Sequence, residues 1–451
     1  MKSGGDMRYK PFWMTQKHGI TRRDFLWLSS MAAAGLMVGC ATNPVTGKSQ
    51  FMLVSEDDEI KLDKQNSLIQ FSADYGPVQD QKLNDYINRT GKNLVKQTHR
   101  PHLPYSFRAV NATYVNAYAF PGGSIAVTRG ILLALDNEAE LAALLGHELG
   151  HVNARHTAQQ MSKGVLTQAV VGSVSVLAGT QGALYGQMAS QVGAIGAGAL
   201  LASYSRDNER EADELGMEYM VRSNYSPKGM IGLMDMLQSL SKHKPGAIEL
   251  MFATHPMGEE RYKTVVETVN SKYKSALNRP LYRERYMDNT ARLRAQKEAI
   301  EEMQKGEKEM GKRSHSQADA HFRKALKKAP DDYAALVYMS TSQLIQKEYA
   351  VGRQYAEMAQ KVYPQEAQAY HFSGFAKIHL KDFEGAYEDF NIYEGLLPGN
   401  PNTIFFKGYC QEKMQHVPEA AKEYRRYLQF VQQGEYATYA YRRINEWGYT
   451  Q

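Results

Sequence analysis

Residues 136–160 read DNEAELAALLGHELGHVNARHTAQQ, the most informative stretch of this 451-residue chain. Leucine and valine recur in it at helical spacing, and Asn137 followed by Glu140 has the pattern of a capping box. The stretch contains His147-Glu148-Leu149-Gly150-His151. Histidines at positions i and i+4 project from one face of a helix, one turn apart, so both imidazoles can reach one zinc ion. The sequence therefore predicts a capped helix that carries half of a metal site.

Glu148 is the candidate for proton transfer at this site. It points about 100° around the helix from His147, beside the position that a water on the metal would take. A carboxylate there can take the proton of the water and later pass it to a leaving amine. We therefore expect one Zn²⁺ per chain with Glu148 as general base. His156 lies further along the same stretch, and we expect it at the surface or in packing, not at the metal.

A second stretch, SRDNEREADELGMEYM at residues 205–220, supplies the missing ligand. At 100° per residue, Glu209 and Asp213 fall on its small and apolar face, one turn apart. The other acids fall on the opposite face, which we expect to be solvated: Asp207, Glu211, Glu214 and Glu218. Two buried carboxylates are costly unless something satisfies them. We assign Glu209 to the zinc and Asp213 to orienting a histidine ligand.

The H-E-x-x-H pattern followed by E-x-x-A-D at residues 209–213 resembles the Ste24-type zinc metalloendopeptidases. The resemblance is strongest to their bacterial periplasmic members, the beta-barrel assembly-enhancing proteases. It covers roughly residues 41–280 and includes these segments: 43–47, 53–56, 116–123, 204–206 and 254–256. It implies that His147, His151 and Glu209 bind zinc and that Glu148 is the base. It also implies that His255 lies close to the zinc, either as a transient fourth ligand or as a donor to the developing oxyanion.

Residues 105–110, 116–120 and 124–128 read as short strands, with a turn signal at residues 121–123. An edge strand beside the metal helix would let an extended peptide add as a further strand. Our substrate-binding candidates for that edge are Asn116, Ala117 and Tyr118.

Residues 164–205 contain no charged side chain and are rich in Ala, Gly and Val. Two interpretations stay open for this segment. We favour a hairpin of small-residue helices over the site, and the alternative is a pair of transmembrane helices, which its many Gln, Ser and Gly residues disfavour.

The N-terminus has the pattern of an export signal. A twin arginine at residues 22–23 precedes an apolar run that ends at Cys40. The run is short for a membrane span and is typical of a signal peptide, and Cys40 is the expected lipidation site. We expect a Tat-like signal at residues 1–39 and a periplasmic protein held to a membrane by its lipid. The outer membrane is favoured because Cys40 is followed by Ala41 and not by an aspartate that would act as an inner-membrane retention signal.

The distribution of the net charge of +6 along the chain predicts that the protein has no nucleic-acid partner. Residues 1–39 account for +4 of it, which leaves about +2 for the remaining chain and no basic footprint.

The C-terminal half is repetitive. Pro330, Pro364 and Pro398 are spaced by 34 residues, with aromatic and small residues at fixed offsets from each. This period resembles the tetratricopeptide repeat. We expect about three and a half repeats from roughly residue 289 to 432, a final helix to about 446, and Cys410 in the core of a repeat. Such arrays present a concave surface that would bind a protein partner.

The predicted fold class is α+β and mostly helical: a zincin-like metalloprotease domain with a small sheet, then an all-α repeat solenoid. The expected domains are residues 1–39, 40–285 and 286–451. The expected function is zinc-dependent hydrolysis of misfolded or stalled envelope proteins. The alternative is a repeat-based chaperone or assembly factor for outer-membrane proteins, with proteolysis secondary.

Overall fold

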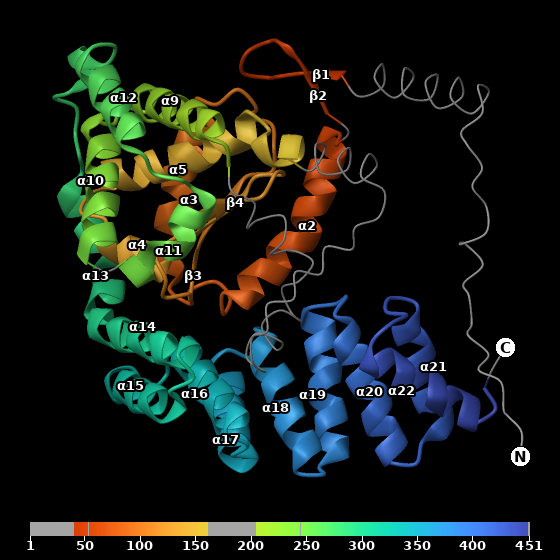
Figure 1. The fold of residues 1–451 in the computed structure, drawn as a ribbon. Coiled ribbons are helices and arrows are strands. Elements are labelled where there is room, and N and C mark those ends of the chain that lie inside the picture. The colour runs from red at the N-terminus through yellow and green to blue at the C-terminus, as the bar shows by residue number, and fades with distance from the viewer. Residues whose placement is uncertain (1–39, 53, 161–203, 244, 450–451) are drawn as a thin grey trace, which may run out of the picture.

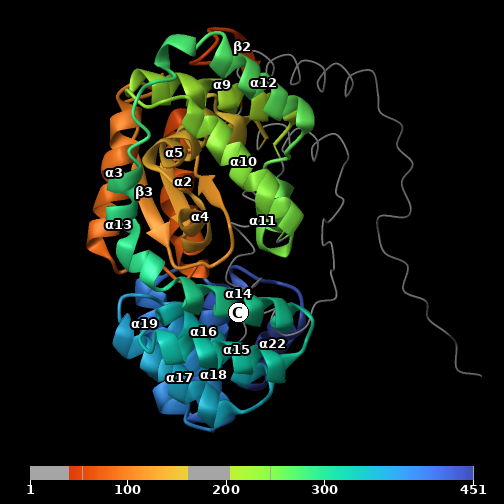
Figure 2. The ribbon, with the colours of Figure 1, turned by 90° about the vertical axis from the view of Figure 1, so that its left-hand side faces the viewer.

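The computed structural model describes residues 40–52, 54–160, 204–243 and 245–449 (Figure 1). The expected signal at residues 1–39 lies outside these ranges, as does nearly all of the expected hairpin at residues 164–205. No helix within the described ranges is both long enough and apolar enough to cross a membrane. An N-terminal part (residues 40–295) carries the sheets, and a repeat array (residues 297–446) lies along one side of it in both views (Figures 1 and 2).

The three-stranded sheet has the order β3-β5-β4. Strand β3 (Ser106–Val110) runs parallel to β5 (Ser124–Thr128), and β4 (Ala117–Ala119) pairs with β5 in the antiparallel direction. The three strands predicted from the sequence are therefore present, and β4 is an edge strand. A separate hairpin is formed by β1 (Cys40–Thr42) and β2 (Ser49–Phe51).

The predicted metal helix is α5 (Glu138–Asn153), and all of its residues are buried. Asn137 caps it, because its Oδ1 accepts from the Glu140 N–H at 3.0 Å and its Nδ2 donates to the Glu140 carboxylate at 2.7 Å. Helix α9 (Arg206–Arg222) crosses α5 at very short range. A Cβ added to Gly150 would lie 2.8 Å from the Ala212 backbone. Small residues on both helices therefore bring the two predicted motifs together.

The other helices of the N-terminal part surround this crossing: α2 (Glu56–Ala73), α3 (Gln81–Val95), α4 (Arg129–Ala134), α10 (Lys228–His243), α11 (Pro245–Thr254), α12 (Glu259–Asn270), the 3₁₀ turn η2 (Lys274–Ala276) and α13 (Arg283–Ala295). Helix α13 begins two residues before the expected domain boundary at residue 285. It packs on α3, α4 and α5, so its contacts group it with the N-terminal part.

The repeat array consists of antiparallel helix pairs followed by α22 (Glu435–Glu446). The pairs are α14 (Lys297–Gly311) with α15 (His315–Lys328), α16 (Tyr333–Ile345) with α17 (Tyr349–Val362), α18 (Gln368–His379) with α19 (Phe383–Leu396), and α20 (Pro401–Lys413) with α21 (Val417–Leu428). A mostly helical protein with a small sheet and a C-terminal helical repeat region is therefore confirmed. Cys410 is buried in α20, as expected.

The number of repeats differs from the prediction. A left-handed residue ends the first helix of every pair: Arg313, Lys347, Lys381 and Gln415, each 34 residues after the last. The residues that cap the C-termini of three second helices, Ala329, Tyr363 and Leu397, have nearly the same backbone conformation, and each comes just before a repeat proline. The array therefore holds four helix pairs, not three and a half. The sequence register missed half of the first pair because no repeat proline precedes it.

Candidate metal centre

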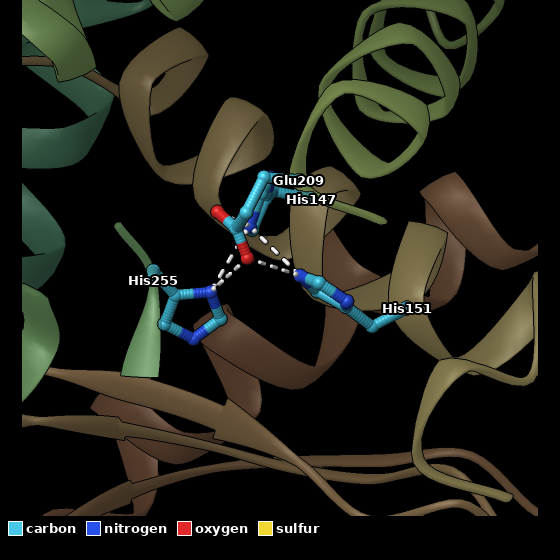
Figure 3. A group of neighbouring side chains, drawn as sticks. All are labelled: His147, His151, Glu209 and His255. Atoms are coloured by element: carbon cyan, nitrogen blue, oxygen red, sulfur yellow. Dashed lines mark hydrogen bonds and ion pairs between the residues drawn. The ribbon is translucent and has the colours of Figure 1, made fainter. Parts of the chain in front are cut away.

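Four side chains from three places in the chain meet beneath the α5–α9 crossing (Figure 3). His147 and His151 come from α5, Glu209 from α9, and His255 follows directly after α11. One ligand atom from each of them lies within 4.8 Å of the others, and all four residues are buried.

The free donor atoms point at one another. Nε2 of His147 and Nε2 of His151 are 3.0 Å apart. Nε2 of His151 is 3.4 Å from Glu209 Oε1, and Nε2 of His147 is 3.6 Å from Glu209 Oε2. Two imidazoles and a carboxylate that converge in this way have the donor set of a catalytic zinc site.

Glu148 adds a second sign that the site fits a metal. Its Oε1 is buried and has no hydrogen-bond partner among the described residues, and the nearest cationic group is His255 Nε2 at 3.8 Å. Burial raises the pKa of Glu148. A buried carboxylate without a partner is costly, and a water on a metal would provide the missing donor.

His255 is drawn into the group by Glu209. Its Nδ1 lies 3.1 Å from Glu209 Oε1 and 3.3 Å from His147 Nε2. Burial opposes the charged imidazole, but the Glu209 carboxylate outweighs it and raises the pKa of His255. The same pairing works in reverse: burial opposes ionisation of Glu209, but His255 and His151 hold its pKa well below the usual range.

Asp213 lies where an orienting role requires it. Its Oδ1 is 2.9 Å from Nδ1 of His147, on the side of the ring that faces away from the other ligands. Arg261 of α12 donates to Asp213 through Nε (2.5 Å) and Nη2 (2.8 Å), and its Nη1 is 2.5 Å from Glu209 Oε2. Burial raises the cost of ionising Asp213, but Arg261 outweighs it and lowers the pKa.

Arg261 was not anticipated from the sequence. The sequence did indicate that a further cation was needed, because Glu209 and Asp213 were both placed on the buried face of one helix and one histidine cannot neutralise both. The cation itself comes from another helix, α12, and nothing in the local pattern there distinguishes Arg261 from a surface arginine.

His156 lies in packing, one of its two expected positions, and is not among the four residues that meet at the site. It is fully buried, its Nδ1 lies 2.9 Å from Nδ1 of His151, and its Nε2 lies 3.1 Å from Glu211 Oε2. Helix α5 ends at Asn153, and Arg155 takes a left-handed conformation with φ of 60°. This turn brings His156 back against the helix that it follows, so helical angles do not apply to it.

Glu211 is consequently not a plain solvated residue. Its side chain is 31% exposed and pairs with His156, whereas the side chain of Glu214 is 65% exposed. The angular assignment of Glu209 and Asp213 to the buried face is correct. Tyr204 is a further residue that was not anticipated as part of the site. Its ring stacks on His151 with centroids 3.8 Å apart and an interplanar angle of 22°.

The edge strand β4 lies against α5. Thr128 N–H donates to Asn116 O, Phe120 N–H donates to Ser124 O, and Tyr118 pairs with Ala126. Because backbone groups alternate in direction along an antiparallel strand, those of Ala117 and Ala119 point away from β5. The Tyr118 side chain points to the far side of the sheet, where its hydroxyl donates to Asp74.

The opposite edge of the sheet is closed. Helix α3 covers β3, where Asn84 Oδ1 accepts from the Ala109 N–H at 3.0 Å and Asn88 Oδ1 accepts from the Phe107 N–H at 3.4 Å. Side-chain amides therefore occupy the outward N–H groups of β3. An added strand would meet β4 rather than β3.

Comparison with known proteins finds similar peptidases for the N-terminal part of the chain. Residues 81–269 match the family described as Peptidase family M48. A beta-barrel assembly-enhancing protease of Yersinia pestis is 31% identical over 237 residues, which are 50% of this chain and 47% of that protein. Metalloprotease YcaL of Escherichia coli (strain K12) is 29% identical over 211 residues, 47% of this chain and 76% of YcaL.

Among solved structures, YrrB, described as a TPR protein with an unusual peptide-binding site, aligns with 46% of this chain and 97% of its own. Its TM-score is 0.31 at 13% identity. The chain spans 47% of the length of the Yersinia protease and 38% of its Escherichia coli (strain K12) counterpart.

Proposed function

We propose that this chain is a zinc-dependent endopeptidase, on the premise that residues 81–269, which match the family described as Peptidase family M48, form a peptidase domain. The observation that carries the proposal is the convergence of His147, His151 and Glu209 beside the buried Glu148, whose Oε1 has no hydrogen-bond partner among the described residues. A structural cluster would be expected to satisfy its buried acids with protein donors.

His147, His151 and Glu209 would hold the zinc. When bound, zinc supplies a Lewis acid that polarises the peptide carbonyl and makes water a better nucleophile at neutral pH. Glu148 takes the proton of the attacking water at its free Oε1 and transfers it to the amine of the leaving peptide. The raised pKa of Glu148 lies nearer to the pH at which the enzyme works than that of a free glutamate. This suits a group that must both accept and release a proton.

Asp213 fixes the ring of His147 through Nδ1, and Arg261 keeps Asp213 ionised. His255 had two expected roles. Its Nδ1 lies among the ligand atoms, 3.1 Å from Glu209 Oε1, and its Nε2 lies 3.8 Å from Glu148 Oε1. We therefore favour the fourth-ligand role at rest over the oxyanion role. Substrate would enter by displacing His255.

The substrate strand would add to β4, through the outward backbone groups of Ala117 and Ala119, next to the expected Asn116 and Tyr118. Main-chain pairing reads little of the side chains, so it suits a protease that acts on many unfolded sequences. We propose misfolded or stalled envelope proteins as substrates and a protein partner for the repeat array. The names of the Yersinia and Escherichia coli relatives support this.

The proposed location is the periplasm, with a lipid at Cys40 as the anchor in a membrane, the outer one favoured. The pattern of residues 1–40 supports this location. Incorporation of labelled palmitate into the wild-type chain but not into Cys40→Ala tests it in cells.

Cleavage of casein tests the catalytic proposal. The wild-type protein should degrade casein, a zinc chelator should stop the reaction, and Glu148→Gln should lower kcat by a factor of about 10²–10⁴ while it keeps its zinc. Glu249→Gln is the matched control, because Glu249 is an exposed residue of α11. If Glu148→Gln cleaves casein at the wild-type rate, the proposal is wrong. If it fails to cleave but keeps full activity in cells, the chaperone alternative takes precedence.

A further inference from the structure

The segment that leads into the substrate strand has no regular structure of its own. Residues 111–116 join β3 to β4, and their carbonyl groups are held from outside the segment. Arg129 donates through Nε to Asn111 O at 2.9 Å and through its backbone N–H to Ala112 O at 3.1 Å. Thr128 Oγ1 donates to Tyr114 O at 2.5 Å. The position of β4 therefore depends on what holds this segment.

The repeat array holds the middle of the segment at Thr113. On α14, Gln304 Nε2 donates to Thr113 O at 2.6 Å, and the Glu307 carboxylate accepts from the Thr113 hydroxyl. Gln304 and Glu307 are three residues apart, so they project from one face of α14. Thr113 is fully buried. Tyr338 of the next helix pair donates to the other oxygen of Glu307 at 2.5 Å and so fixes that carboxylate.

A buried ion pair connects the same segment to α16. Arg129 Nη1 lies 2.5 Å from Asp332 Oδ2, and both side chains are almost completely buried. Asp332 is also the N-cap of α16, because its Oδ1 accepts from the Ala335 N–H at 3.0 Å. The start of the second helix pair is thus linked through Arg129 to the carbonyl of Asn111.

Strand β4 is connected to this segment by one more buried group. The Asp74 carboxylate accepts from the Tyr114 hydroxyl at 2.8 Å and from the Tyr118 hydroxyl at 2.5 Å. Tyr114 belongs to the segment and Tyr118 to β4. Next to Asp74, the ring of Tyr75 meets the ring of Tyr338 with centroids 4.8 Å apart.

We propose that Gln304 and Glu307 are positioning residues for the substrate strand: the first repeat pair sets the place of β4 by holding Thr113. This inference rests on the proposed function of β4. Among the residues that the structure describes, His147 and His151 make their side-chain hydrogen bonds within the N-terminal part. The repeat array consequently acts on substrate affinity and leaves the chemical step alone. A protein bound to the first repeats would change KM by shifting α14.

The test compares variants on α14 with a fluorogenic peptide taken from a casein site that the wild-type protein cleaves. Glu307→Ala should raise KM about tenfold, since it removes a charged hydrogen-bond acceptor from a buried hydroxyl. Its kcat and zinc content should stay at wild-type values. Amide hydrogen exchange in residues 111–120 should become faster, and this readout does not depend on activity.

Two further variants keep the test decisive. Glu307→Gln should restore both KM and exchange, because an amide can still bond to the Thr113 and Tyr338 hydroxyls. Glu298→Ala is the control, since Glu298 is an exposed acid of the same helix that pairs with Lys328. If Glu307→Ala is too unstable to assay, Gln304→Ala removes the other bond to Thr113 and is judged by the same criteria.

An equal fall in kcat, or unchanged KM and unchanged exchange, would overturn the positioning role. A wild-type protein with no zinc-dependent cleavage would refute the proposed function instead. In that case faster exchange in residues 111–120 of Glu307→Ala would still show that α14 holds the strand.

Discussion

Buried acids occur in two regions of this molecule, and their surroundings differ. At the contact between the N-terminal part and the repeat array, Asp332 pairs with Arg129 and caps a helix, and Glu366 Oε1 accepts from the Ser72 hydroxyl and the Ala367 N–H. In the metal centre, Glu148 Oε1 has no such partner among the described residues. The buried acids at the contact with the repeat array therefore have their donors in the protein, whereas the missing donor at Glu148 Oε1, beside three converging ligand side chains, indicates a ligand.

The largest effect is expected where the metal centre depends on a protein cation. Arg261→Ala leaves Glu209 and Asp213 buried without their arginine, so the metal-free protein should lose about 3–5 kcal/mol of unfolding free energy. Arg210→Ala is the control on α9, where Arg210 makes exposed ion pairs and should contribute about 1 kcal/mol or less. Denaturant unfolding of the metal-free forms measures both. Equal losses would remove the distinction between the two regions.

The next effect concerns zinc itself. Glu209→Ala removes one ligand of a site whose total binding free energy should be of the order of 10–16 kcal/mol, so affinity should fall roughly a hundredfold to a thousandfold. Glu214→Ala changes an exposed acid five residues further along α9, about 1.4 turns away, and should keep its zinc. Metal content after dialysis against a weak chelator measures both. Zinc retained by Glu209→Ala would contradict the ligand assignment.

A pH-dependent effect is expected at the interface. Burial raises the pKa of Glu366 to about 7 from 4.5. Since the folded state then holds this proton more tightly than the unfolded state, the stabilising contribution is complete below pH 4.5 and is lost as the pH rises through 7. Glu366→Gln stays neutral at every pH. It should therefore be more stable than the wild-type protein at about pH 8, by roughly 3 kcal/mol at most, and equal to it at about pH 4.

Thermal unfolding at both pH values measures the Glu366 effect, with the exposed Glu298→Gln as control. A stability difference that is the same at both pH values would mean that titration of Glu366 is not its cause.

The smallest effect is expected at the contact behind His151. His156→Ala removes the ring that lies against Nδ1 of His151, so zinc should bind about 10–100-fold more weakly. His102→Ala is the control, because His102 is exposed and pairs with Glu56 far from the ligands. Competition with a chelating dye measures both affinities. An unchanged zinc affinity in His156→Ala would mean that His156 has a packing role only.

The repeat region shows which features of the fold can be predicted. Its 34-residue period follows from prolines and small residues that recur in the sequence, because each helix pair repeats the same local packing problem. The first pair was counted as half because the sequence before residue 297 carries no repeat proline, although Arg313 takes the same left-handed conformation as its three counterparts. The first helix pair therefore repeats the backbone conformation of the other three, although it lacks the preceding proline that marks them in the sequence.

The sequence by itself determined the local parts of the site. Helical angles placed His147 and His151 on one face, and they placed Glu209 and Asp213 on the buried face of another helix. Such angles depend only on the regular backbone of one helix. They ceased to apply at Arg155, where the chain turns back and buries His156.

Only the tertiary structure decided which distant groups complete the site. Arg261 reaches Asp213 from α12, Tyr204 stacks on His151, and α14 holds Thr113 in the segment that leads into β4. These contacts join residues that are far apart in the chain, so no local pattern encodes them. They exist because the close α5–α9 crossing and the packing of the repeat array leave buried charges and carbonyls that need partners, and the folded chain supplies those partners from wherever its surfaces meet.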